Sequence, residues 1–130
     1  MLLIDTRDKP DKIKHITDYL DRHKIPYDRT KLYIGDYQRA DNPLVLIDRK
    51  QNLLEMANNA TQGHERFKRE LERLTAINGK MYILIEENLN SLEDVQEWKS
   101  PVKRDGTPYT KLQGRTLYKI MLSWQHRHNI

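Results

Sequence analysis

The stretch Gly35–Lys50, with the sequence GDYQRADNPLVLIDRK, determines how the middle of this chain is expected to fold. Leu44–Ile47 is a short apolar run rich in residues that favour β-structure. Asn42-Pro43, just before that run, is typical of a turn. The preceding residues, 27–36, are expected to form another strand, apolar in its second half. The pattern therefore predicts a β-hairpin.

Charged side chains at the ends of these two strands suggest a metal site. Because side chains alternate along a strand, Asp48 and Lys50 are expected on one side of the sheet and Arg49 on the other. The hairpin would bring Asp36 beside Asp48. Adjacent carboxylates repel each other, so the pair favours a divalent cation, and oxygen ligands favour Mg²⁺ or Mn²⁺ over zinc. The alternative is an exposed hairpin with ordinary surface charges.

The composition indicates one folded domain of 130 residues, with 37% apolar and 32% charged residues. No segment approaches the roughly 18 apolar residues of a membrane span. The opening residues, MLLIDTRD, are too short and too acidic for a signal peptide. The chain contains no cysteine, which excludes disulfides and thiolate zinc sites and is compatible with a reducing, cytoplasmic compartment.

The basic character of the chain is concentrated in its last quarter. The formal net charge is +4, but residues 99–130 alone carry +6, so the rest of the chain is slightly acidic. A mildly basic protein suits a polyanionic partner, although many basic proteins bind none. The basic loop over 99–115 supplies the predicted DNA-binding residues, which are Lys103, Arg104, Lys111 and Arg115. The alternative is a solvated loop.

The remaining apolar patterns predict an α/β fold. Strands are expected over 2–5 and 81–85, and helices over 10–24, 64–78 and 115–127, with a short helix from Leu53, a loop over 57–63 and one or two helical turns over 91–98. The order β-α-β-β-(α)-α-β-(α)-α predicts a mixed sheet flanked by helices on both faces. Either the chain is truncated or the fold ends on the last helix.

Four ordered landmarks resemble the nuclease domain of the XPF family. They are Ile4-Asp5-Thr6-Arg7-Asp8, Gly35-Asp36, Ile47-Asp48-Arg49-Lys50 and Arg66 on a helix after a loop. The family opens with V-D-x-R-E and continues with a G-D pair, an E-R-K triplet and a helical arginine. It belongs to the restriction-endonuclease-like PD-(D/E)xK superfamily, so the resemblance implies that core fold.

Three positions depart from the family pattern. Asp48 and Asp8 each stand where the family has a glutamate. The acidic residue that the family carries four positions after its lysine is Leu54 here, with Glu55 beside it. Successive helical residues point about 100° apart, so Glu55 is not an automatic replacement. The helix-hairpin-helix pair that usually follows the nuclease domain is not found after Glu87.

The resemblance also implies roles for the acidic residues and the lysine. By this resemblance, Asp36 and Asp48 would be metal ligands, and the backbone carbonyl of Arg49 would be a third ligand. Lys50 is similar to the residue that faces the attacking water and the scissile phosphate. Asp5 is similar to an acidic residue of the same site, either as a ligand or as a neighbour of the ligands.

The arginines and Asp8 have two interpretations each. Arg7 and Arg66 resemble groups that face a phosphate or orient a carboxylate, which a guanidinium does well. Arg66 alternatively forms surface ion pairs with Glu65 or Glu70 on its own helix. Asp8 is expected to cap the first helix rather than to take part in catalysis.

Two functions follow from the resemblance. The first is a Mg²⁺- or Mn²⁺-dependent DNA endonuclease that hydrolyses phosphodiester bonds in branched or junction DNA, as a small phage or mobile-element resolvase would during DNA repair or recombination. The second is a catalytically inactive DNA-binding or scaffold module of the same fold. An RNA-processing nuclease of this fold is a third alternative. A homodimer would suit cleavage of two strands.

Overall fold

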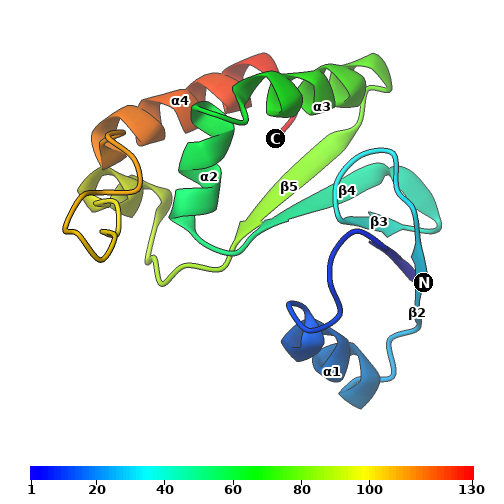
Figure 1. The fold of residues 1–130 in the computed structure, drawn as a ribbon. Helices are drawn as coiled ribbons and strands as arrows, with labels where there is room; N and C mark the ends of the chain where they lie inside the picture. The colour runs from blue at the N-terminus through cyan, green and yellow to red at the C-terminus, as the bar shows by residue number, and fades with distance from the viewer.

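A five-stranded mixed β-sheet lies at the centre of the protein, whose computed structural model describes all residues, 1–130 (Figure 1). The strands are β1 (Leu2–Asp5), β2 (Tyr27–Thr30), β3 (Tyr37–Arg39), β4 (Asn42–Lys50) and β5 (Lys80–Ile85), in the spatial order β2-β1-β3-β4-β5. The pairs β1–β2 and β4–β5 are parallel, whereas β1–β3 and β3–β4 are antiparallel. The predicted α/β fold with a mixed sheet is therefore confirmed.

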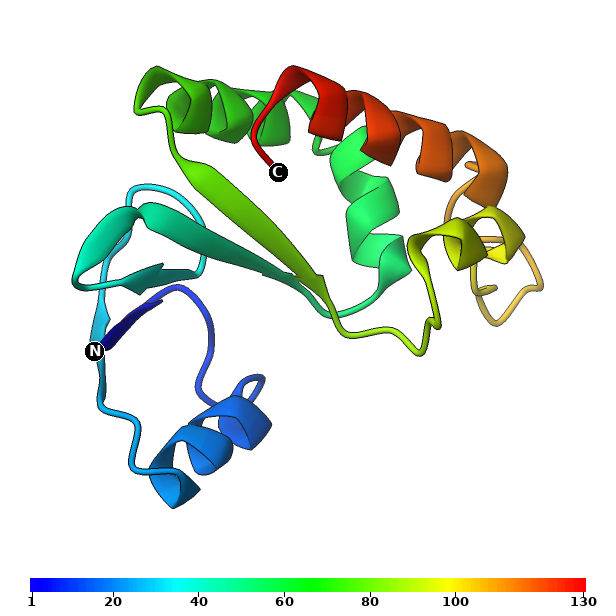
Figure 2. The same cartoon turned by 180° about the vertical axis from the view of Figure 1, so that it is seen from behind.

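Helices cover both faces of this sheet. On one face lies α1 (Lys14–Arg22), and on the other lie α2 (Leu53–Ala60), α3 (His64–Ala76) and α4 (Gly114–Arg127), as Figure 2 shows from behind. A 3₁₀ helix, η1 (Leu92–Glu97), packs near α4. None of the helices has both the length and the apolar character needed to cross a membrane.

Strand β4 divides its side chains between two apolar clusters. Leu46 belongs to the larger cluster beneath α2, α3 and α4, whereas Ile47 packs against the smaller cluster around Ile4 and Ile13 on the α1 side. This is the alternation expected of a strand that is covered on both faces. Because β4 is held from both sides, the residues at its end have well-defined directions.

The predicted strand over 27–36 is wrong in its second half. Strand β2 ends at Thr30, and residues 31–36 are irregular, so the sheet has five strands rather than the four expected. Gly35 has a positive φ of 72°, and a Cβ there would lie 3.0 Å from the carbonyl oxygen of Ile47. The chain therefore turns sharply at Gly35, and a shorter strand, β3, pairs with β4 instead. The hairpin turn lies at residues 40–41, because Asn42-Pro43 already belongs to β4.

Helix bounds differ from the predicted ranges in two places. The first helix begins at Lys14 rather than at residue 10, and no side chain caps its N-terminus. Helix α2 extends to Ala60, where a loop was expected, and Asn52 caps its N-terminus by accepting the N–H of Glu55 at 2.9 Å. The expected loop over 101–114 contains a bridge between Val102 and Pro108. The other helices lie within two residues of their expected bounds.

Candidate functional site

Two backbone contacts bring Asp36 to the end of β4. Its N–H donates to the carbonyl of Ile47 at 2.8 Å, and its Oδ2 accepts the N–H of Arg49 at 2.7 Å. The carboxyl group of Asp36 therefore lies against the strand segment that carries Asp48. The sharp turn at Gly35 makes this approach possible, because a side chain there would collide with β4.

These residues line a polar pocket of about 360 Å³ that is bounded by the ends of β1 and β4 and by helices α2 and α3. We call it the acidic pocket. The pocket contains every predicted catalytic and metal-binding residue and a few neighbours. Its lining comprises Asp5, Arg7, Asp8, Gly35, Asp36, Asp48, Arg49, Lys50, Glu55, Asn59, Arg66, Phe67, Glu70 and Arg73.

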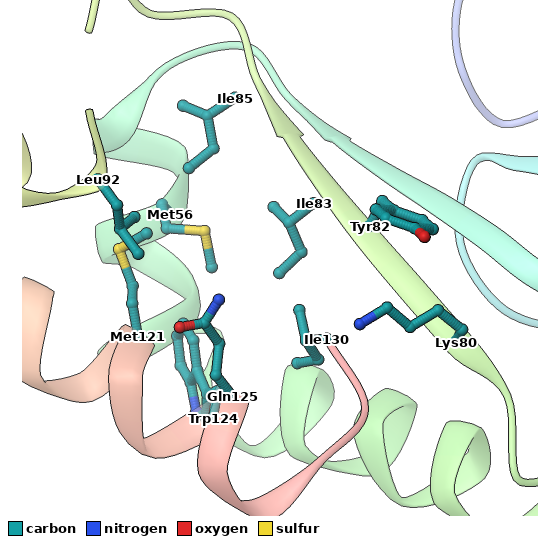
Figure 3. A pocket seen from close by; sticks show the side chains of 10 residues that line it. All are labelled: Met56, Lys80, Tyr82, Ile83, Ile85, Leu92, Met121, Trp124, Gln125 and Ile130. Atoms are coloured by element: carbon teal, nitrogen blue, oxygen red, sulfur yellow. The ribbon is translucent and has the colours of Figure 1, made fainter. Parts of the chain in front are cut away.

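A second cavity, of about 330 Å³, lies between β5 and α4 and has a different character (Figure 3). Most of its lining is apolar, including Met56, Ile83 and Trp124. No Asp or Glu lines it, and its polar side chains are limited to Lys80, Tyr82 and Gln125. Because its lining brings no acidic side chains together, the acidic pocket is the candidate site for a hard cation.

Asp48 and Lys50 form a buried ion pair in the acidic pocket. The Nζ of Lys50 lies 3.0 Å from Oδ2 of Asp48, and the two residues are only 7% and 5% exposed. Although the charges are close, Oδ2 of Asp48 is buried and accepts no hydrogen bond. Lys50 Nζ also lies 5.2 Å from the centre of the ring of Phe67, a residue of α3, and this cation–π contact stabilises the ammonium.

The carboxyl groups are crowded, and this changes the protonation of Asp36. The pKa of Asp36 is raised to about 8, first by burial and then by the hydrogen bond with Asp48 and the negative charge of Asp48. The pKa of Glu70, on α3, is also raised, first by burial and then by the charge of Asp48. Without a cation, the pocket therefore holds more negative groups than can ionise together.

The oxygen donors fit a hard divalent cation. Asp48 has a buried oxygen whose partner is the Lys50 ammonium, with no aligned hydrogen bond, and Asp36 has a carboxyl whose ionisation a cation would favour. No third Asp, Glu or His joins them in a group that could hold a metal ion. Mg²⁺ is usually held by one or two carboxylates, and waters and substrate phosphates complete its coordination. The two carboxylates are sufficient for a site of that type.

Arg49 points to the opposite face of β4 from Asp48 and Lys50, as the strand period predicts. Its guanidinium donates to both oxygens of Asp8, at 3.0 and 3.2 Å, and to Glu86 at 2.7 Å. Glu86 also contacts His15 at 2.6 Å, which links α1 to the end of β5. The expected helix cap by Asp8 is therefore wrong, because its carboxylate binds Arg49 instead.

Asp5 lies in the pocket wall, where an arginine already binds its carboxylate. Arg7 donates to Asp5 Oδ2 at 2.6 Å from Nε, and the backbone N–H of Leu32 donates to Oδ1 at 3.4 Å. Arg7 also donates to the carbonyl of Leu32 at 2.9 Å, so it ties β1 to the loop before β3. Its side chain remains 61% exposed at the pocket edge. The role of Asp5 as a metal ligand stays a prediction.

Arg66 and the predicted DNA-binding residues are exposed. Arg66 lines the acidic pocket and makes no ion pair, so the alternative in which it pairs with Glu65 or Glu70 is not seen. The four predicted DNA-binding residues all lie on the surface, and two of them, Lys111 and Arg115, line a separate recess next to η1. No residue of this basic segment lines the acidic pocket.

Glu70 and Asn59 are pocket residues that were not among the predicted site residues. Glu70 accepts the N–H of Gly35 at 3.0 Å, and thereby holds the turn that presents Asp36. Asn59 is buried, and its Nδ2 donates to no group. Both follow another pocket residue by four positions, because Glu70 follows Arg66 and Asn59 follows Glu55. Polar residues at this spacing share a helix face, which is the signal that would have found them.

Comparisons with known proteins agree with this fold. The ERCC4 domain model matches residues 4–130. No curated protein matches the sequence significantly. Among solved structures, XPF from Aeropyrum pernix is similar, with a TM-score of 0.58 and 19% identity over 98% of this chain and 54% of that one. This chain thus spans about half the length of that structure. Because the domain match covers nearly all residues, the chain belongs to the ERCC4 domain family, the nuclease family that its motifs indicate.

Proposed function

We propose that this protein is a divalent-metal-dependent endonuclease that hydrolyses phosphodiester bonds in branched or junction DNA. The supporting observation is the buried group of Asp36, Asp48 and Lys50, in which two crowded carboxyl groups have a single ammonium between them. Two buried carboxylates with only one positive charge beside them are costly, so a fold that keeps them together usually supplies a further cation. A hard cation is the ligand that suits two crowded carboxylates.

Each residue of this group has a chemical role in the proposal. Bound Mg²⁺ or Mn²⁺ would polarise the phosphate and increase the acidity of a water molecule. Asp36 and Asp48 hold the ion. Lys50 orients the attacking water and neutralises charge that develops on the phosphoryl oxygens. The water oxygen bonds to phosphorus as the bond to the leaving sugar oxygen breaks, and that oxygen takes up a proton.

Other side chains supply the grip on DNA. Arg66 is exposed at the pocket and unpaired, and Asn59 has a free amide donor in the pocket wall. Both suit the non-bridging oxygens of a phosphate. The exposed cations of residues 99–115 suit phosphates farther along the strand. Asp5, Arg7 and Glu70 position the ligands, because they hold the backbone of the loop that carries Asp36.

The second candidate function is a module of the same fold that binds DNA without cutting it. The observation in its favour lies at the start of α2. Leu54 occupies the position at which the family has an acidic residue, and the neighbouring carboxylate of Glu55 already accepts the N–H of Gln51 at 2.7 Å. Glu55 is therefore engaged with the backbone rather than free for a cation.

Metal titration combined with a nicking assay distinguishes the two functions. The purified protein would be titrated with Mn²⁺ and incubated with a labelled fork and a Holliday junction. We expect Mn²⁺ to bind at the acidic pocket and the junctions to be nicked. Asp48→Ala and Lys50→Ala should each reduce nicking at least 100-fold while leaving the circular dichroism spectrum unchanged. Wild-type rates in both variants would contradict the proposal, and binding without nicks would select the inactive module.

The proposal extends to the organisation of the protein. We propose that residues 1–130 form a single domain, because one sheet is shared by both apolar clusters. Action on DNA implies a place inside the cell. A homodimer would allow two strands to be cut symmetrically, and its test is the mass of the protein in solution with and without junction DNA.

A further inference from the structure

A third recess adjoins the acidic pocket and contains no acidic side chain. It has a volume of about 370 Å³ and is lined by Arg7, Lys31, Leu32, Tyr33 and Arg73. Arg7 and Arg73 also line the acidic pocket, so the two recesses share a wall. We call the surface formed by Lys31, Tyr33 and Arg73 the Tyr33 shelf. It lies on the loop between β2 and β3, which is cyan in Figure 1.

Tyr33 is fixed in an outward direction by its neighbours. Leu32 and Ile34 on either side are 5% and 3% exposed, whereas Tyr33 is 72% exposed. The backbone of this loop is tied to both β1 and α3, because Leu32 contacts Asp5 and Arg7 and because Gly35 donates to Glu70. A large aromatic ring is therefore presented to water on a segment that is already ordered, which lowers the entropic cost of binding.

Arg73 completes the shelf from α3. Its guanidinium lies 5.1 Å from the centre of the Tyr33 ring, and its Nε is buried without a hydrogen-bond acceptor. Arg73 forms no ion pair, Lys31 forms none either, and no acidic side chain lines this recess. One exposed ring with two unpaired cations, Lys31 and Arg73, beside an acidic pocket is the combination that suits a nucleotide, because the base stacks and the phosphate pairs with the cations.

We propose that the Tyr33 shelf binds one unpaired nucleotide of DNA next to the phosphate that enters the acidic pocket. The base stacks on the open face of Tyr33, and its phosphate is held by Lys31 and Arg73. A paired base in a duplex has both faces covered by its neighbours, so a single exposed ring selects an unpaired one. The shelf would thus supply the preference for branched DNA. That the ligand is DNA rests on the proposed function.

The test uses a DNA fork with 2-aminopurine in the unpaired strand beside the branch point, in buffer with EDTA so that cutting does not interfere. We expect the wild-type protein to quench the 2-aminopurine on binding. Tyr33→Phe should retain the quenching. Tyr33→Leu should abolish it and weaken fork binding by roughly five- to hundred-fold, the range that a single base–aromatic stack supports. Binding of a fully paired duplex should change less than about twofold, because stacking is absent there.

The chain offers a matched control at Tyr82. This tyrosine is 56% exposed and has the Nζ of Lys80 at 5.4 Å from its ring centre, but it lines neither the shelf nor the acidic pocket. Tyr82→Leu should leave both the quenching and the fork affinity unchanged. Lys31→Ala changes an exposed residue and should have little effect on folding. If Lys31 contacts one phosphate of the single strand, this variant should reduce the slope of log affinity against log salt concentration by about 0.7.

The outcomes separate this proposal from the nuclease proposal. The same variants would be assayed for nicking with Mn²⁺. Loss of quenching in Tyr33→Leu together with a wild-type protein that never nicks would support the shelf and contradict the nuclease. A wild-type protein that nicks, with Tyr33→Leu equal to it in quenching and affinity, would overturn the shelf alone. Failure of the wild-type protein to bind the fork at any salt concentration would overturn both.

Discussion

The backbone N–H of Arg49 donates to Oδ2 of Asp36 at 2.7 Å, while the guanidinium of the same residue binds Asp8 in the loop between β1 and α1. Arg49 therefore holds Asp36 through its main chain and Asp8 through its side chain. The first contact holds the carboxyl group of Asp36 beside Asp48, and the second anchors the strand that carries both Asp48 and Lys50. Several measurable properties follow from that arrangement.

The first prediction concerns pH and the stability of the metal-free protein. The pKa of Asp36 is raised from its ordinary value of 3.8 to about 8. Between these values the folded protein holds a proton that the unfolded chain has released, so stability should fall as pH rises through this window. The slope from this group is at most about 1.4 kcal/mol per pH unit. Urea denaturation from pH 4 to 8 measures it.

Asp36→Asn provides the control, because it should flatten the slope that Asp36 contributes. Asp48→Asn should also reduce it, since removing the charge of Asp48 lowers the pKa of Asp36. An unchanged slope in Asp36→Asn would mean that other groups produce the pH dependence. Mn²⁺ should restore stability at pH 8, because an ion that binds only the folded state stabilises it.

The second prediction concerns the ion pairs of Arg49. Its side chain is 8% exposed and that of Asp8 is 11% exposed, so Arg49→Met would leave buried carboxylates without a partner. We expect the free energy of unfolding to fall by about 3–5 kcal/mol. Arg49→Lys should recover only part of this loss, because an ammonium cannot bind Asp8 through two parallel hydrogen bonds. Urea denaturation at pH 7 provides the measurement.

Arg39 is the matched control for Arg49. It pairs with Asp41 at 2.6 Å, but both side chains are more than half exposed. Arg39→Met should therefore lower the free energy of unfolding far less than Arg49→Met does. Similar losses for Arg39→Met and Arg49→Met would show that burial does not set the strength of these pairs.

The third prediction concerns the contact between α4 and η1. A Cβ on Gly114 would lie 2.3 Å from the carbonyl oxygen of Val95 and 2.6 Å from that of Trp98. Both are backbone atoms that cannot move aside alone, so Gly114→Ala should destabilise the protein by about 2–3 kcal/mol. Gly106→Ala is the comparison, because Gly106 has a positive φ of 86° but open space around it. Gly106→Ala should cost only about 1 kcal/mol. Thermal melting of both variants measures the two losses, and a larger loss in Gly106→Ala than in Gly114→Ala would contradict the prediction.

The fourth prediction concerns the basic segment at the start of α4. Lys111 and Arg115 are exposed and line the recess next to η1. If each contacts one phosphate of duplex DNA, Lys111→Ala and Arg115→Ala should each reduce the log–log salt slope of binding by about 0.9. Fluorescence anisotropy at several NaCl concentrations gives this slope. Lys12→Ala, an exposed change outside the basic segment, should leave it unaltered, and an equal change there would indicate a general charge effect.

Much of this fold could be predicted because it depends on local patterns. The apolar runs of β4 and β5 and the helical spacing of Phe67, Leu71 and Leu74 identify elements that the structure confirms. The strand period of two also determines that Asp48 and Lys50 share one face while Arg49 takes the other. These features follow from neighbours in the chain, and no distant contact alters them.

The tertiary structure decided what local patterns cannot encode. Residues 31–36 look like a strand in sequence, yet Leu32 and Ile34 are buried by packing and not by strand pairing. Asp8 looks like a helix cap, but its carboxylate finds Arg49 41 positions away. Glu70 and Asn59 reach the acidic pocket only because α2 and α3 pack over the end of β4. The sequence alone determines which way side chains point along one element, whereas their partners depend on how distant elements pack together.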